Sequence, residues 1–185
     1  MPSFQDFYFQ SSTGRTSIHA LKCVPDSKPR AVVQIAHGIA EHIDRYRPFM
    51  EFLADNGFVV AGNDHLGHGK SIRVPGEQGF FAEKDGWWRV VDDMDKLHDI
   101  MSNEYPELPY VLFGHSMGSF LTRTYLIKHP DKYDGVILSG TGHQSPALVL
   151  GGNAAASVMA KLNGAMGDGA KLDSLAFGTY LSKIE

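Results

Sequence analysis

The sequence predicts an α/β fold built on a doubly wound, mostly parallel sheet. Short apolar runs alternate along the chain with helical segments, which is the pattern of parallel strands joined by crossover helices. The chain has 185 residues, of which 43% are hydrophobic and 21% are charged, close to the average of soluble proteins. Its length and composition indicate one globular domain and exclude a disordered, collagen-like or coiled-coil chain.

Six segments predict β-strands, because each is a short apolar or alternating run bounded by turn-forming residues. In chain order they lie at residues 6–10, 17–24, 31–36, 58–61, 110–114 and 135–139. The segment at 17–24 alternates, with Ile18, Ala20 and Lys22 on one face. The later segments are almost continuously apolar, which is typical of strands buried on both faces of a sheet.

Three segments predict α-helices, since their apolar residues recur at helical spacing. They lie at residues 49–55, 87–104 and 117–128. Each is followed by a pair of residues that typically ends a helix, namely Asn56-Gly57, Tyr105-Pro106 and His129-Pro130. The long glycine-containing segment at 63–86 is expected to be a functional loop, as loops of that length in compact domains usually are.

The character of the sequence changes after Gly142. Residues 143–185 are rich in Gly, Ala, Leu and Met, are weakly helical, and contain no strong β run. We therefore expect residues 1–142 to form the sheet core and residues 143–185 to begin a region that covers it.

Charge and cysteine content restrict the classes of partner. The 17 Lys and Arg residues against 21 Asp and Glu residues give a net charge of −4, which argues against nucleic-acid binding. The single cysteine, Cys23, forms no internal disulfide. The N-terminus shows no secretory signal, and the longest uncharged stretch, residues 144–160, is too short and too polar for a membrane span. We therefore expect a soluble, cytoplasmic protein.

The pentapeptide Gly114-His115-Ser116-Met117-Gly118 is the strongest chemical signal. It fits the G-x-S-x-G pattern, in which a serine nucleophile sits on a sharp turn between a strand and a helix. Gly114 and Gly118 supply clearance where the backbone approaches itself, and the amide of Met117 can donate to an oxyanion. The alternative is an ordinary strand-to-helix turn bounded by glycines.

A second signal follows the strand at 31–36, where the chain continues as His37-Gly38-Ile39. A His-Gly pair at the tip of a strand that precedes the nucleophile strand suits a second oxyanion donor. Gly38 lets the backbone turn, and the amide of Ile39 is the expected donor. His37 itself is expected to brace this loop by packing, because the donors are main-chain groups.

A third signal is the polar segment at 63–71, which contains Asp64, His65 and His68. These side chains are of metal-ligating types, but their spacing matches no recognised metal site. Gly67 and Gly69 favour a tight loop instead. We expect neither a metal ion nor a cofactor.

Together these motifs resemble the branch of the α/β-hydrolase superfamily that holds monoacylglycerol lipases and bacterial lysophospholipases. The resemblance extends over residues 7–142, nearly the whole of the expected core. It implies that Ser116 attacks an ester carbonyl and forms an acyl-enzyme, with the oxyanion between the amides of Ile39 and Met117. Ser119 departs from the pattern, since many members carry another glycine there, and this should affect helix packing more than chemistry.

A serine nucleophile needs a histidine base and an orienting carboxylate, which in this fold follow the serine in the order acid, then histidine. After Ser116 the chain contains only His129 and His143. His129 is expected at the opposite edge of the sheet, and His143 has no suitable acid before it. His115, next to the nucleophile, is expected to be structural. The Asp and the His of the triad are therefore not found in this chain.

The resemblance also implies further strand-helix units that carry these two residues. At about 30 residues per unit, roughly 90 residues of core would be absent. Residues 143–185 would be the beginning of a cap over the acyl chain, or else a pair of surface helices. We expect a complementary C-terminal segment or chain, without which the 185-residue product would aggregate through its unpaired strand edge.

The function expected from these features is that of a serine hydrolase acting on lipid esters, such as monoacylglycerols or lysophospholipids. One alternative is an aminopeptidase or small-ester hydrolase on the same framework, which would need an acidic cap residue to hold an amine. The other alternative is a truncated, noncatalytic α/β binding module.

Overall fold

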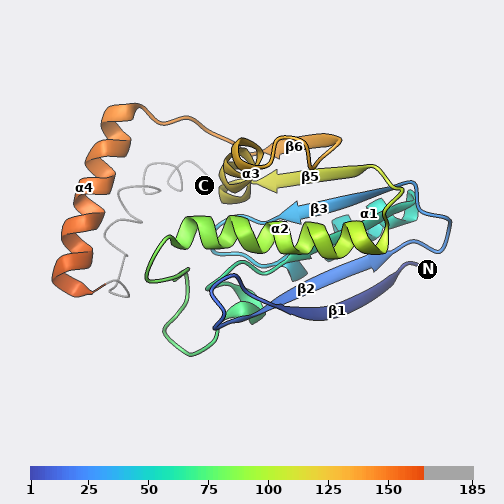
Figure 1. The fold of residues 1–185 in the computed structure, drawn as a ribbon, viewed down its shortest axis with the longest axis horizontal. Coiled ribbons are helices and arrows are strands. Elements are labelled where there is room, and N and C mark those ends of the chain that lie inside the picture. Colours follow the sequence, from blue (N-terminus) through green and yellow to red (C-terminus); the bar gives the residue numbers. More distant parts are fainter. Residues whose placement is uncertain (165–185) are drawn as a thin grey trace, which may run out of the picture. The chain divides into compact units, whose positions relative to one another are not determined.

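The structure is a computed structural model that describes residues 1–164 (Figure 1). It contains the strands β1 (Ser3–Gln10), β2 (Ser17–Val24), β3 (Ala31–Ala36), β4 (Phe58–Asn63), β5 (Tyr110–His115) and β6 (Gly135–Ser139). Its helices are α1 (Arg47–Asp55), α2 (Gly86–Glu104), α3 (Met117–Lys128) and α4 (Pro146–Asn163), with 3₁₀ turns η1 (Ile43–Tyr46) and η2 (Gly69–Ser71).

The six strands form one sheet in the order β1-β2-β4-β3-β5-β6. The pairs β4–β3, β3–β5 and β5–β6 are parallel, whereas β1–β2 and β2–β4 are antiparallel. The predicted α/β fold with a mostly parallel sheet is therefore confirmed. β1 begins earlier than the sequence predicts because it pairs with β2 along its whole length, from Ser3 opposite Val24 to Gln10 opposite Ser17.

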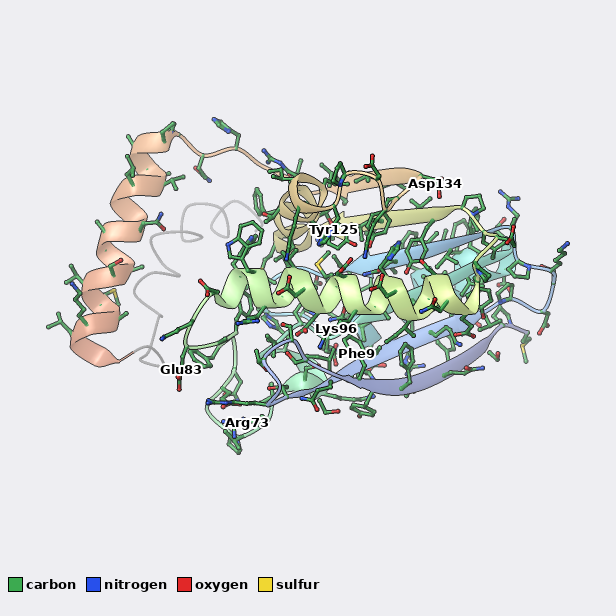
Figure 2. The ribbon with its side chains drawn as sticks, viewed as in Figure 1. Phe9, Arg73, Glu83, Lys96, Tyr125 and Asp134 are labelled. Atoms are coloured by element: carbon green, nitrogen blue, oxygen red, sulfur yellow. The ribbon has the colours of Figure 1, made fainter. Side chains whose placement is uncertain are left out.

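Helices cover the two faces of the sheet. Met94 of α2 and Leu121 and Tyr125 of α3 belong to one buried apolar cluster, and Figure 1 shows α2 running across this face. Tyr125, labelled in Figure 2, also donates its hydroxyl to Asp95 of α2. Met50 of α1 packs into a separate cluster on the opposite face. The two faces of β3 are thus both buried, in keeping with its apolar sequence.

Lys96 of α2 connects this helix to the hairpin of β1 and β2. Its Nζ donates to the carbonyl oxygen of Gln10 at 2.8 Å. Phe9 packs on the cluster beneath α2. The hairpin is therefore held to the core by packing as well as by its pairing with β4.

Cys23 of β2 lies on the α1 side of the sheet and is completely buried. Burial, together with the nearby Glu51 and Asp55 carboxylates, raises the pKa of its thiol to about 11. A thiol in this state is a small apolar core residue with little nucleophilic character.

The parallel register brings the ends of three strands to one edge of the sheet. Ala36 of β3 lies opposite Gly114 of β5, and His115 lies opposite Ser139 of β6. The residues that follow β3 and β5 therefore meet at the carboxyl end of the sheet, which is where open α/β sheets place their functional groups.

The chain divides after Gly142 into two compact units. In the second unit, α4 begins at Pro146, and the side chain of Ser145 caps it by accepting a hydrogen bond from the Leu148 amide at 3.4 Å. The role of residues 143–185 as a cap stays a prediction. Within residues 1–164, no helix combines the length and apolar composition needed to cross a membrane.

Candidate active site

Ser116 occupies a sharp turn between β5 and α3. Its backbone has φ 51° and ψ −119°, in a region that non-glycine residues rarely adopt and that costs about 1–3 kcal/mol. The surrounding structure holds it there through its amide, which donates to Ser139 O at 2.9 Å. Its carbonyl accepts from the amide of Ser119 at 2.9 Å and from the Ser119 hydroxyl at 2.6 Å. The serine that departs from the family pattern thus adds a hydrogen bond to the turn.

Gly114 and Gly118 lie where the backbone of this turn packs most closely. A Cβ atom on Gly114 would lie 2.6 Å from Gly118 O, and one on Gly118 would lie 2.7 Å from His37 O. Real Cβ atoms essentially never come this close to other heavy atoms. Glycine at both positions therefore lets α3 start directly against the end of β3.

The loop after β3 lies beside Ser116. A Cβ atom on Gly38 would be 3.1 Å from the Cβ of Ser116, so the two chain segments are in contact. The amide of Ile39 has no hydrogen-bond acceptor within residues 1–164. The amide of Met117 also has none there, because Met117 is the first residue of α3. Two backbone donors without an acceptor among these residues thus belong to the two chain segments next to Ser116, one in the loop after β3 and one at the start of α3.

His37 fixes the direction of this loop. Its Nε2 accepts a hydrogen bond from the His65 amide at 2.9 Å, which requires the tautomer that carries its proton on Nδ1. Nδ1 then donates to Gly38 O at 2.7 Å. Because a trans peptide points its C=O and N–H in opposite directions, this bond also turns the Ile39 amide away from the His37 ring.

His37 and His65 form a buried stack. Their ring centroids are 4.0 Å apart, and both side chains are inaccessible to solvent. Burial lowers the pKa of His37 to about 4, and burial with the neighbouring histidines lowers the pKa of His65 well below its usual value. Both rings are therefore neutral at physiological pH, and neither is suited to be a general base.

These shifts predict that the chain loses stability in mild acid. The unfolded chain takes up a proton on His37 near pH 6.5, whereas the folded chain does so only near pH 4, so the free energy of unfolding falls as pH decreases between these values. We expect the protonation of His37 alone to lower the free energy of unfolding by about 2 kcal/mol between pH 7 and pH 5. Urea unfolding at the two pH values measures this change. The loss should be smaller in His37→Gln, and an equal loss would contradict the assignment.

Asp64 is a buried carboxylate with several hydrogen-bond partners, a structural role that its sequence motif does not reveal. Its carboxylate accepts the amides of Ile43 and Lys70, each at 2.8 Å, and lies 2.9 Å from Nδ1 of His19. The other nitrogen of His19 lies 2.7 Å from Asp6, and this contact, with Lys70, lowers the pKa of Asp6. Hydrogen bonds of Asp64 thus connect the polar loop after β4 to β2 and to η1.

The histidines near Ser116 in sequence do not provide a base. Nδ1 of His115 lies 3.2 Å from the hydroxyl of Ser139, at the side of the turn. His129 follows α3, whose 12 residues span about 18 Å, so it lies at the far end of that helix from Ser116. The predicted absence of a triad Asp and His from this chain stays a prediction.

One group of possible metal ligands occurs within residues 1–164, namely Asp95, His98 and Asp99 of α2. The ammonium group of Lys132 lies 2.6 Å from Asp95 and 2.9 Å from Asp99, so these carboxylates already have a cation. Asp64, His65 and His68 are not such a group; the Asp64 carboxylate accepts backbone amides, and the His65 ring packs on His37.

The sequence is similar to a known protein family and to several lipases. The profile of the family described as "Serine aminopeptidase, S33" matches residues 27–181. Monoacylglycerol lipase of Mycolicibacterium smegmatis is 36% identical over 143 residues, which cover 75% of this chain and 48% of that protein. Human monoglyceride lipase is 32% identical over 114 residues, which cover 62% of this chain and 36% of that protein.

Solved structures agree with these sequence matches. A carboxyl esterase from Bacillus coagulans, solved in complex with glycerol, superposes with a TM-score of 0.86 at 35% identity, covering 99% of this chain and 58% of that one. The chain thus spans about half the length of the relatives it matches. The predicted resemblance is confirmed: the chain belongs to the serine aminopeptidase S33 family and has the fold of the α/β-hydrolases.

Proposed function

We propose that the whole protein is a serine hydrolase that cleaves carboxylic esters of lipid type, monoacylglycerols or lysophospholipids, through an acyl-enzyme at Ser116. The observation that carries the proposal is the strained turn of Ser116, next to the amides of Ile39 and Met117, which have no acceptor within residues 1–164. Relatives named as monoacylglycerol and monoglyceride lipases support the substrate class. A cytoplasmic location is part of the proposal, since the single cysteine forms no internal disulfide.

The proposed chemistry follows from this geometry. The hydroxyl oxygen of Ser116 attacks the ester carbonyl carbon, and the carbonyl oxygen becomes an oxyanion that accepts hydrogen bonds from both amides. A general base takes the hydroxyl proton and returns it to the departing alcohol. Water then attacks the acyl-enzyme in the same way, releasing the fatty acid and restoring the serine.

The base and its carboxylate would come from outside these 185 residues. We propose that a complementary segment carries them and extends the sheet beyond β6. Within residues 1–164, β6 pairs with β5 on one side only. Its apolar side chains Val136, Ile137 and Leu138 are exposed on both faces, which is unusual for a strand of this composition and supports a further neighbour.

The second candidate is an aminopeptidase, which the description of the matching family favours. Such an enzyme must hold the free amine of its substrate, for which an acidic side chain near the site is needed. The acidic residues of the segment expected to begin the cap, Asp168, Asp173 and Glu185, lie outside the residues that the structure describes.

Substrate hydrolysis by the whole protein tests the two candidates directly. The substrates are a monoacylglycerol, a lysophospholipid and an aminoacyl naphthylamide, each with and without prior treatment by a fluorophosphonate. We expect fatty acid release from one or both lipids, and we expect the fluorophosphonate to block it. Preferential cleavage of the naphthylamide would contradict the lipid assignment, and cleavage of none would support the noncatalytic module.

A further inference from the structure

The side chain of Glu41 lies inside the loop that carries the expected oxyanion donor. Its Oε1 atom accepts hydrogen bonds from the Gly38 amide and from the Tyr46 hydroxyl, the latter at 2.7 Å. Its Oε2 atom lies 3.2 Å from a guanidinium nitrogen of Arg45. The Glu41 side chain is only 9% exposed, whereas the Arg45 side chain is 64% exposed. Glu41 is therefore held mainly by the Gly38 and Tyr46 donors and only weakly by the ion pair.

The hydrogen bond between Glu41 and the Gly38 amide means that both backbone polar groups of Gly38 are held. Glu41 holds the N–H of Gly38, and His37 holds its C=O. With both ends of one residue fixed, the next donor along the chain, the Ile39 amide, has a fixed direction. Ala40 follows with φ 56°, a left-handed conformation that costs a non-glycine residue free energy. A loop with this strained residue needs such anchors to stay in one conformation.

The Tyr46 hydroxyl keeps the carboxylate in place. Burial and the contact with Glu41 raise the pKa of Tyr46 far above its usual range, so the hydroxyl stays a donor at any working pH. Tyr46 belongs to η1 and packs against the cluster beneath α1. The anchor of the loop thus connects to the core rather than to solvent.

We propose that Glu41 is a positioning residue for the oxyanion site, which rests on the proposed function of Ser116. Its carboxylate sets the direction of the Ile39 amide by fixing the Gly38 amide beside it. Because the oxyanion forms only in the transition state, losing this alignment should lower kcat and leave KM nearly unchanged.

Two variants separate the geometry of the contact from its charge. Glu41→Gln keeps an oxygen in the same place and can still accept both hydrogen bonds, but it has no charge. Glu41→Asp keeps the charge but shortens the side chain by one methylene, so its oxygens cannot reach Gly38 and Tyr46 as before. Arg45→Gln removes only the exposed ion pair and serves as the matched control.

The measurement is kcat and KM for ester hydrolysis by the whole protein, with thermal unfolding to verify that each variant is folded. We expect Glu41→Asp to lower kcat by about 10- to 100-fold, as misplacing one oxyanion donor does. Glu41→Gln should stay within about threefold of the wild type, because it loses only the charge assistance of its hydrogen bonds. Arg45→Gln should stay within about twofold.

The outcomes distinguish this proposal from the function on which it rests. A larger loss in Glu41→Gln than in Glu41→Asp would overturn it, since charge rather than reach would then matter. An unchanged kcat in Glu41→Asp, or a change confined to KM, would also overturn it. In both cases an active wild-type protein leaves the proposed function intact, whereas a wild-type protein that hydrolyses no ester contradicts the proposed function itself.

Discussion

Replacing Ser116 with alanine should abolish acylation of the whole protein and reduce ester hydrolysis by about 10⁵- to 10⁶-fold in kcat. The reason is that the neighbouring serine hydroxyls within residues 1–164 already have hydrogen-bond partners. Ser119 lies one helical turn further on, and its hydroxyl is already donated to Ser116 O. Ser139 lies on the next strand, with its hydroxyl against His115. Ser116 is the serine that lies at the turn between β5 and α3, in contact with the loop after β3.

The measurement for Ser116→Ala is labelling by a fluorophosphonate probe, followed by the rate of fatty acid release. Ser17, an exposed serine at the start of β2, provides a matched control, and Ser17→Ala should be labelled as fast as the wild type. Labelling that persists in Ser116→Ala would place the nucleophile elsewhere and remove the basis of the proposed mechanism.

Gly118→Ala should be the most damaging conservative substitution in the core. The added methyl group would meet the carbonyl group of Ala36, and it would lie 2.6 Å from the Ala36 carbonyl carbon and 2.7 Å from His37 O. These are backbone atoms at the end of β3, a strand paired on both sides, so they cannot move aside. We expect the free energy of unfolding to fall by about 3 kcal/mol or more, together with loss of probe labelling.

Gly135→Ala is the control for this prediction. A Cβ atom at position 135 would find its nearest neighbour, a methyl carbon of Val111, at 3.5 Å, which is an ordinary contact. Gly135 lies at the start of β6 and Gly118 in the first turn of α3, but both substitutions add the same methyl group to a glycine. Urea denaturation of the whole protein compares the two. Similar midpoints for both variants would mean that the turn can shift to accommodate a side chain.

The features that could be predicted from the sequence are those set by neighbouring residues. The apolar runs at β3 and β5 and the glycines around Ser116 reflect local requirements, namely burial on both faces and clearance at a sharp turn. The order of strands and helices followed from the same alternation. For this reason the α/β fold and the position of the serine can be inferred from the sequence alone.

The features that the sequence did not reveal depend on contacts between distant segments. Asp64 attracted attention only as a possible metal ligand, yet its carboxylate accepts the amide of Ile43, which lies 21 residues away in the chain. Its place directly after a buried strand was a signal that could have indicated a structural anchor. Glu41 follows the His37-Gly38 pair by only three residues, but nothing in its neighbours shows that Gly38 turns its amide back toward it.

The state of Cys23 makes the chain convenient for site-specific chemistry. Cys23 is its only cysteine, is fully buried, and has a pKa raised to about 11, so only about one molecule in 10⁴ carries the reactive thiolate at pH 7. A cysteine introduced at an exposed position, such as Ile137 on β6, would therefore be alkylated against almost no background. A fluorophore attached there would report on whatever polypeptide pairs with that strand.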